Sequence, residues 1–134
     1  MQRQNIATGS KWEDIVGYSR AVKIGNTIEI SGTVATDASG EIVGVGNVYL
    51  QTKFIFYKIE GVLHQLGAKM ADVVRTRIFL TDISKWEEVG RAHGDFFASI
   101  KPATSMLEVS KLIAPEYLVE IEVTAILSDS PSTI

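Results

Sequence analysis

Three glutamates lie in two β-patterned runs near the end of the chain, residues 103–110 and 118–126. In the second run Glu120 and Glu122 alternate with apolar residues, which places both carboxylates on the polar face of a strand. Glu108 has a similar place in the first run. Because glutamate is depleted in strands, the three carboxylates indicate either a solvated sheet face or a cleft in which a carboxylate acts as a general acid or base.

The two runs are separated by seven residues, with Pro115 among them. A parallel crossover needs about a dozen residues or more, whereas antiparallel strands can be joined by a short connection. We therefore expect the two runs to form an adjacent antiparallel pair, with their carboxylates on neighbouring strands.

Other side chains offer less chemistry. The chain has no cysteine, which excludes disulfides, thiolate nucleophiles and zinc–thiolate sites. His64 and His93 lie on different predicted helices without a third ligand at metal-site spacing, so we expect no metal and no other cofactor. His93 falls on a buried helix stripe and is interpreted as a core histidine. The cations Arg20, Lys23 and Lys69 are too sparse for a nucleic-acid footprint.

The carboxylates need a sheet to position them, and five β-patterned runs supply it. These runs cover residues 18–24, 27–34, 72–80, 103–110 and 118–126. Gly25-Asn26, between the first two runs, is typical of a tight hairpin turn. Gly32, near the end of the second run, predicts a β-bulge or the close approach of another group.

Two helices are predicted between these strands. Asn47 is a good N-cap for a helix over residues 48–66, which has one apolar face and ends at Gly67. Ser84 and Glu87 fit a capping box for a second helix that ends near residue 99. Its buried stripe is expected to hold Trp86, Val89, His93 and Phe96 or Phe97.

This order of elements predicts an α+β domain with one mixed sheet and both helices on one face. The face without helices is then expected to carry Phe79, Met106, Leu118, Ile126 and either Ile28 or Ile30. An uncovered and partly apolar sheet face predicts self-association.

The composition is ordinary for a globular protein, with 46% hydrophobic and 22% charged residues among 134. We expect one domain over 1–134, with an irregular lead-in over 1–17 that holds at most a short edge strand, and a flexible tail over 128–134. The net charge of -3 gives no general attraction to nucleic acid or to an anionic membrane. The sequence shows no signal peptide and no membrane-spanning run, which favours a cytoplasmic location.

Nine short motifs in order carry a resemblance to a known family. They are ISGTV (30–34), G with VG (40, 43–44), QT (51–52), LGA with DVV (66–68, 72–74), LTD (80–82), FF (96–97), PA (102–103), EV with L (108–109, 112) and LVEIE (118–122). Over nearly its whole length the chain resembles the RidA family, also called YjgF-like proteins. The resemblance implies a chorismate-mutase-like α+β fold and a homotrimer with ligand clefts between its subunits.

The resemblance also implies an activity. The family's best-known reaction is hydrolysis of reactive enamines and imines, such as 2-aminoacrylate, to 2-keto acids and ammonia. Members with this activity carry an arginine directly after Pro-Ala, where it holds the substrate carboxylate through a bidentate pair. Here that position is Thr104, which has neither the positive charge nor the paired N–H donors of an arginine. Met106 stands where many relatives have cysteine, and Gly90 where active members often have asparagine.

The remaining cleft positions of the family fit better. Glu120 matches the acidic residue that would orient a water or move a proton, and is the expected catalytic residue. Tyr18, Gly32, Thr104 and Met106 occupy the expected substrate-binding positions.

A structural interpretation of the carboxylates stays open beside the catalytic one. Glu120 could be a solvated or interface carboxylate bonded to backbone. For Glu122 and Glu108 the structural interpretation is preferred, with Glu122 in an intersubunit ion pair with Arg75 or Arg77.

Three functions therefore remain in view. The first is a hydrolase of small reactive nitrogen compounds, with weak or altered activity because Thr104 replaces the arginine. The second is a trimer that binds a small metabolite without turnover, and the third is a protein-interaction trimer. Ribonuclease activity, described for some relatives, would need an acid/base pair and a basic groove that the sequence does not supply.

Overall fold

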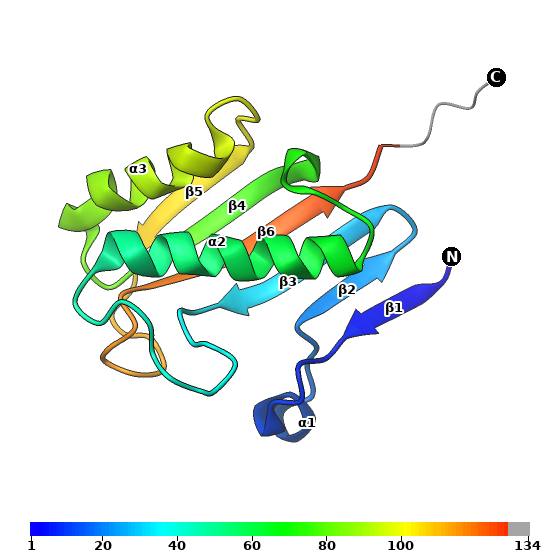
Figure 1. The fold of residues 1–134 in the computed structure, drawn as a ribbon, viewed down its shortest axis with the longest axis horizontal. Helices are drawn as coiled ribbons and strands as arrows, with labels where there is room; N and C mark the ends of the chain where they lie inside the picture. The colour runs from blue at the N-terminus through cyan, green and yellow to red at the C-terminus, as the bar shows by residue number, and fades with distance from the viewer. Residues whose placement is uncertain (129–134) are drawn as a thin grey trace.

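Residues 1–128 are described by the structure, which is a computed structural model. In chain order its elements are β1 (Arg3–Ile6), α1 (Lys11–Val16), β2 (Ala21–Ile24), β3 (Thr27–Thr33), α2 (Val48–Gln65), η1 (Met70–Asp72), β4 (Val73–Leu80), η2 (Ile83–Lys85), α3 (Trp86–Phe97), β5 (Ala103–Glu108) and β6 (Val119–Ile126) (Figure 1). Within these residues no helix has the length and apolar character needed to cross a bilayer. The predicted tail lies outside the described residues except for Ser128.

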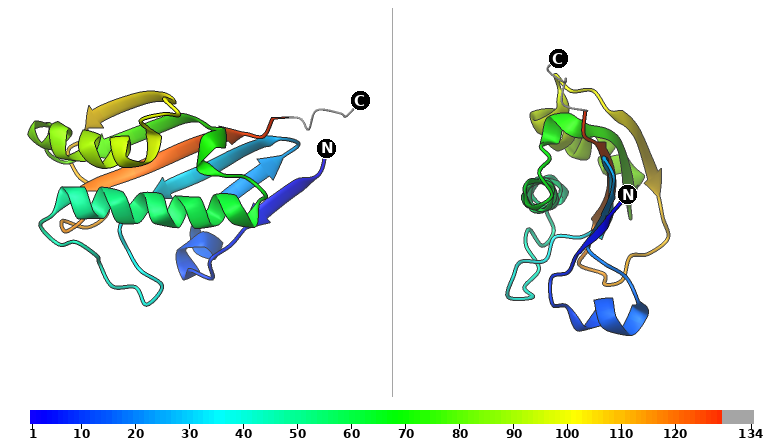
Figure 2. Two further views of the ribbon diagram at one scale, coloured as in Figure 1. Left: turned by 45° about the horizontal axis from the view of Figure 1, so that its top comes forward. Right: turned by 90° about the vertical axis from the view of Figure 1, so that its right-hand side faces the viewer.

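The six strands form one sheet in the order β1-β2-β3-β6-β4-β5. β4 and β5 are parallel, and the other neighbouring pairs are antiparallel. α2 and α3 lie on the same side of this sheet, as the end-on view in Figure 2 shows. The predicted α+β fold, a mixed sheet with two helices on one face, is confirmed.

The predicted pairing of residues 103–110 with 118–126 is wrong. β6 lies between β3 and β4, whereas β5 lies on the far side of β4. α3 supplies the crossover that makes β4 and β5 parallel. The short connection after β5 reverses the chain direction, as expected, but it crosses the end of β4 instead of forming a hairpin. Glu108 and Glu120 are therefore not on adjacent strands.

The core lies between the sheet and α2, and it follows the predicted periodicities. The buried residues of β6 are Val119, Ile121, Val123 and Ala125, and those of α2 include Ile55, Ile59 and Leu63. The residues that alternate with them on β6 are partly exposed. This alternation places Glu120 on the sheet face that α2 and α3 leave open, which we call the open face.

α2 begins and ends where the sequence predicts. The side chain of Asn47 accepts a hydrogen bond from the backbone N–H of Leu50 at 3.0 Å. Gly67 follows the helix with a φ of 81°, the left-handed conformation that favours glycine, and its N–H donates to the carbonyl of His64. These caps fix the end of α2 above the sheet.

The start of α3 differs from the prediction. Ser84 lies in η2, where the carboxylate of Asp82 accepts hydrogen bonds from both its N–H and its hydroxyl. The N-cap of α3 is therefore Lys85, which makes no side-chain cap hydrogen bond, and the first α-helical residue, Trp86, is 54% exposed. The buried stripe of α3 holds Val89, Ala92 and Phe97.

The N-terminal residues are more regular than predicted. β1 is the short edge strand that the sequence allows, but α1 was not expected. Ser10 caps α1 by accepting from the N–H of Trp12. Glu13, which is buried, accepts from the N–H and hydroxyl of Thr8, and Gly17 ends the helix with a φ of 90°. This short helix is therefore stabilised by its caps, and it has no apolar periodicity from which it could have been predicted.

The open face is less apolar than predicted. Ile28 and Ile30 belong to the core, and Met106 and Leu118 pack partly buried against it, so these four do not lie on the open face. Met106 pairs with the buried Ile78 in the parallel register of β4 and β5, which turns its side chain toward the helices. Of the predicted residues, Phe79 and the exposed Ile126 do lie on the open face, which also carries Leu107, the register partner of Phe79.

Replacing Gly61 by alanine should stabilise the fold. Gly61 lies in the interior of α2, it is exposed, and a β-carbon there would have nothing within 4 Å. Alanine in an exposed helix interior is favoured over glycine by about 0.5–1 kcal/mol. Chemical denaturation should show this gain, and a loss of stability would mean that the exposed side of α2 is covered in solution.

Candidate functional site

A β-bulge in β3 forms the centre of the candidate site. The register between β3 and β6 shifts between Ile30 and Thr33, as the glycine at position 32 predicted. A β-carbon added to Gly32 would overlap the Oε2 atom of Glu120 and lie 3.0 Å from its Cδ. The bulge therefore brings a bare stretch of backbone directly against the carboxyl group of Glu120.

Glu120 is the acidic residue beside this bulge. It is half-buried on β6, opposite Phe79 of β4. Burial raises the pKa of its carboxyl above the ordinary value of 4.5, the nearby charge of Glu122 raises it further, and Arg20 opposes both effects. No hydrogen bond within residues 1–128 contributes to this shift. A structural carboxylate is usually held by donors, so the raised pKa and the missing donors are the observations on which a catalytic interpretation of Glu120 would rest.

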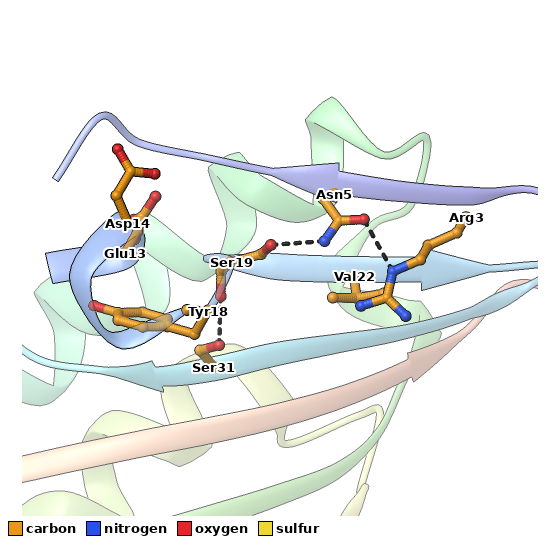
Figure 3. Close-up of a pocket in the computed structure, with 9 residues that line it drawn as sticks. Arg3, Asn5, Glu13, Asp14, Tyr18, Ser19, Val22 and Ser31 are labelled. Carbon is orange, nitrogen blue, oxygen red and sulfur yellow. Dashed lines mark hydrogen bonds between the residues drawn. The ribbon is translucent and has the colours of Figure 1, made fainter. Parts of the chain in front are cut away.

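Tyr18 lies beside the bulge, just after the end of α1. Its ring is 39% exposed, and the guanidinium carbon of Arg20 is 5.7 Å from the ring centroid. Tyr18 and Ser31 line an open cavity of about 470 Å³ between α1 and the first strands (Figure 3). The hydroxyl of Ser31 donates to the carbonyl of Ser19 across this cavity wall.

Polar side chains continue this wall along β1. Asn5 donates its side-chain amide to the hydroxyl of Ser19 at 2.7 Å, and Arg3 donates to the amide oxygen of Asn5 at 3.1 Å (Figure 3). The cavity is therefore polar and solvent-facing, and it adjoins the bulge through Ser31.

Thr104 lies on the other side of the sheet from Glu120. It pairs with the buried Thr76, and the two hydroxyl oxygens are 2.8 Å apart. The Nε2 atom of His93 on α3 is 3.0 Å from the Thr76 hydroxyl and 3.4 Å from the Thr104 hydroxyl. The hydroxyl of Thr104 is thus engaged on the helix side of the sheet, although the residue itself is exposed, and Met106, two residues on, turns toward the core.

Of the five predicted site residues, one chain therefore brings together Tyr18, Gly32 and Glu120. Thr104 and Met106 belong to the helix-covered side of the sheet. A site containing all five would need a second copy of the chain.

His93 lies where the sequence placed it, among core aromatic rings. The rings of Phe56 and Phe97 lie 5.6 and 4.7 Å from it between centroids. Burial lowers the pKa of its imidazole, which favours the neutral form. Within residues 1–128, no group of three or more possible ligands could hold a metal ion.

The other two carboxylates have structural partners. Glu122 pairs with Arg77 at 3.9 Å, within one chain and with both side chains exposed. The predicted partner is therefore found, in the same chain instead of across an interface. Glu108 accepts from the backbone N–H of Ile83 at 3.0 Å, which fixes the turn after β4.

Arg20 is the residue of this site that the sequence analysis missed. It was grouped with scattered surface cations, yet its charge lies close enough to Glu120 to lower the pKa of that carboxyl. A signal for it existed. A two-residue turn at Gly25-Asn26 aligns Ala21 with Ile30, and the next pair outward is Arg20 with Ser31, at the bulge.

Comparisons with known proteins agree with this fold. The family described as endoribonuclease L-PSP matches residues 8–127. A RutC family protein of Pyrococcus abyssi is 33% identical over 126 residues, which are 93% of this chain and 98% of that protein. The 3-aminoacrylate deaminase RutC of Acinetobacter baylyi is 29% identical over 104 residues, which are 78% of this chain and 82% of that protein.

A solved structure gives the same result. The crystal structure of a YjgF family member from Mycobacterium tuberculosis has a TM-score of 0.85 and 46% sequence identity, and the match covers 94% of this chain and 100% of that one. The chain therefore belongs to the RidA/YjgF family, the family described as endoribonuclease L-PSP.

Proposed function

We propose that the protein hydrolyses small reactive enamines and imines to carbonyl compounds and ammonia, with Glu120 as its acid/base group. The observation that carries this proposal is a half-buried carboxyl with a raised pKa, held against the bare backbone of Gly32. A carboxyl with a pKa closer to neutrality transfers protons more effectively near neutral pH. The relative named 3-aminoacrylate deaminase supports the substrate class.

The proposed chemistry needs only water and proton transfers. An enamine first takes a proton on carbon and gives up a proton from nitrogen, which converts it into the imine. Water then adds to the C=N bond, forming a C–O bond while the nitrogen gains a proton. The C–N bond breaks, ammonia leaves, and the hydroxyl proton goes to the departing nitrogen. Glu120 would accept the proton from the attacking water and return it to nitrogen.

The cleft proposed for this reaction lies between subunits of a homotrimer. The open face carries Phe79 and Leu107 beside Glu120, and Leu107 is 50% exposed. A neighbouring chain packed against these residues would exclude water from Glu120 and raise its pKa further. Sedimentation at micromolar concentration should give a trimer mass, and a monomer mass would remove the intersubunit cleft.

A weaker or altered specificity is proposed because of Thr104. The active relatives place a guanidinium at this position, and here a neutral hydroxyl is already bonded to Thr76. The same observation favours the second candidate function, a cytoplasmic trimer that binds a small metabolite without turnover. RNA cleavage is disfavoured, because a chain with a net charge of -3 lacks the attraction to phosphate that nucleases use.

The test is release of pyruvate from freshly generated 2-aminoacrylate, measured beside an arginine-bearing relative. The chain should accelerate release above the uncatalysed rate, more slowly than the relative does. Release of malonate semialdehyde from 3-aminoacrylate is measured in the same way, because this compound is the substrate named for the Acinetobacter protein. No acceleration with either compound by a folded trimer would refute the hydrolase and leave the binding function.

A further inference from the structure

The backbone of Arg20 is fixed at the edge of the candidate site. Its N–H donates to the carbonyl of Ile6 at 2.8 Å, and its carbonyl accepts from the N–H of Ser31 at 3.0 Å. Arg20 thus connects the end of β1 with the bulge of β3. Ser31 directly precedes Gly32, which lies against Glu120. These backbone hydrogen bonds therefore fix the position of Arg20 relative to Glu120.

The guanidinium of Arg20 has unused hydrogen-bonding capacity. Its Nε atom is buried and has no acceptor within residues 1–128. The ion pairs in this part of the chain are Lys53–Asp95, Arg77–Glu122 and Lys85–Glu88, and none of them includes Arg20. A buried donor without a partner costs free energy, and a guanidinium presents a fork that matches a carboxylate. The unpaired donor therefore points to an acceptor that residues 1–128 do not supply.

The surroundings of Arg20 are those of the site already described. Its guanidinium carbon is 5.7 Å from the centroid of the Tyr18 ring. Its charge acts on the carboxyl of Glu120, although the two groups form no ion pair at 4.0 Å or less. A cation and a proton-exchanging carboxyl thus lie close together without neutralising each other, which leaves the cation free to bind a ligand.

Lys58 is the other cation near Arg20, but it is engaged. Its ammonium donates to the carbonyls of Val34 and Thr36, both at 2.8 Å. Burial and the charge of Arg20 lower its pKa to about 8. Lys58 therefore adds positive potential, while Arg20 keeps the free donors.

We propose that Arg20 binds the carboxylate of the substrate at the Glu120 site, in the role for which Thr104 is unsuited. This inference rests on the proposed function of that site. It commits to a monocarboxylate, because the carboxylates of Glu120 and Glu122 would repel a dianion such as phosphate. The carbonyl or imine carbon next to the carboxylate would then lie within reach of Glu120.

The test is binding of pyruvate, a product-like carboxylate, measured by calorimetry on the trimer as it exists. Arg20→Gln should weaken pyruvate binding about tenfold or more, since a charge-assisted pair is lost. The pyruvate affinity of Arg20→Lys should lie between those of wild type and Arg20→Gln, because lysine keeps the charge but lacks the bidentate geometry of the guanidinium. The neutral analogue pyruvamide should bind wild type and Arg20→Gln alike, and phosphate should bind wild type more weakly than pyruvate.

Arg91 offers a matched control. Its guanidinium also stacks on an aromatic ring, with 4.6 Å from its carbon to the centroid of Tyr49, but it lies on α3. Arg91→Gln should leave pyruvate binding unchanged. Equal pyruvate affinity for wild type and Arg20→Gln, or no pyruvate binding by wild type, would overturn the assignment of Arg20.

A second measurement does not depend on a variant that folds. In wild type, the Nε–H signal of Arg20 in a nitrogen-resolved NMR spectrum should shift and exchange more slowly with solvent when pyruvate is added. An unchanged signal at saturating pyruvate would overturn the inference.

The outcomes also separate this inference from the proposed function. Turnover that survives Arg20→Gln without change would refute the role of Arg20 and spare the hydrolase. Pyruvate binding that is lost in Arg20→Gln, with no turnover in wild type, would support Arg20 and refute the hydrolase.

Discussion

Replacing Glu120 by glutamine is expected to lower kcat/KM for an imine substrate by about 100-fold or more, which is the usual contribution of a general acid/base. Glutamine keeps the size of the side chain and the contact with Gly32, but it cannot exchange a proton. Steady-state kinetics with 2-aminoacrylate measures the loss. Glu122→Gln is the matched control, since Glu122 lies two residues on along the same strand and forms an exposed ion pair. Glu122→Gln keeps the carboxyl of Glu120 and its burial and removes only the smaller effect of Glu122 on its pKa, so it should lose much less activity. Equal losses in the two variants would mean that charge alone matters.

Stability should change in the opposite direction. The pKa of Glu120 is raised in the folded chain, so its contribution to stability is fully present below the unfolded pKa and is lost as pH rises through the folded pKa. At pH 7 the ionised carboxylate therefore destabilises the fold, and Glu120→Gln should melt at a higher temperature than wild type. The difference should shrink at pH 4. A lower melting temperature at pH 7 would instead identify Glu120 as a structural carboxylate with a partner.

Replacing Gly32 by alanine is expected to give the second large loss of activity. The added methyl group would overlap the Oε2 atom of Glu120. Gly32 does not have a positive φ, so the backbone accepts alanine. The carboxyl is the free end of a flexible side chain and should swing away, leaving the chain folded. Misplacement of a catalytic group by about 1 Å can cost roughly 100-fold in rate.

A double-variant cycle shows whether this loss passes through Glu120. In a Glu120→Gln background, Gly32→Ala should add little further loss, because the group it displaces no longer transfers a proton. Additive losses would mean that Gly32 acts separately, for example through its own N–H. Gly61→Ala, where the new methyl group meets nothing, is the control for adding a methyl group.

Local patterns in the sequence predicted the parts of the fold that depend on local physics. The alternation of β6 placed Glu120 on the polar face, because side chains alternate in any strand. Asn47 and Gly67 marked the ends of α2 because capping involves only neighbouring residues. Gly32 marked the bulge for the same kind of reason.

The order of strands could not be predicted in this way. Seven residues between two runs fix the relative direction of the runs, but they do not exclude a third strand between them. With β4 inserted, the face of β5 that carries Thr104 lies under α3, and the face of β6 that carries Glu120 is open. The strand order decides which polar side chains lie on the same side of the sheet. It depends on contacts between residues that are far apart in the sequence, and only the structure shows them.

Arg20 was missed for a related reason. As a lone cation in the sequence it resembles any surface residue. Its meaning comes from two distant partners, the carbonyl of Ile6 and the N–H of Ser31, which place it beside Glu120. Extending the predicted pairing of the β2–β3 hairpin by one residue beyond Ala21 and Ile30 aligns Arg20 with Ser31, at the bulge.

Titration of the Glu120 carboxyl carbon by NMR measures whether this group has the raised pKa that proton exchange in a desolvated site requires. The spectrum of wild type, assigned through Glu120→Gln, should give a titration midpoint above the ordinary value of 4.5. Adding pyruvate should raise the Glu120 midpoint further, because a second carboxylate then lies near it. A midpoint at or below 4.5 in the folded protein would show that Glu120 is an ordinary ionised carboxylate and would contradict its role in proton transfer.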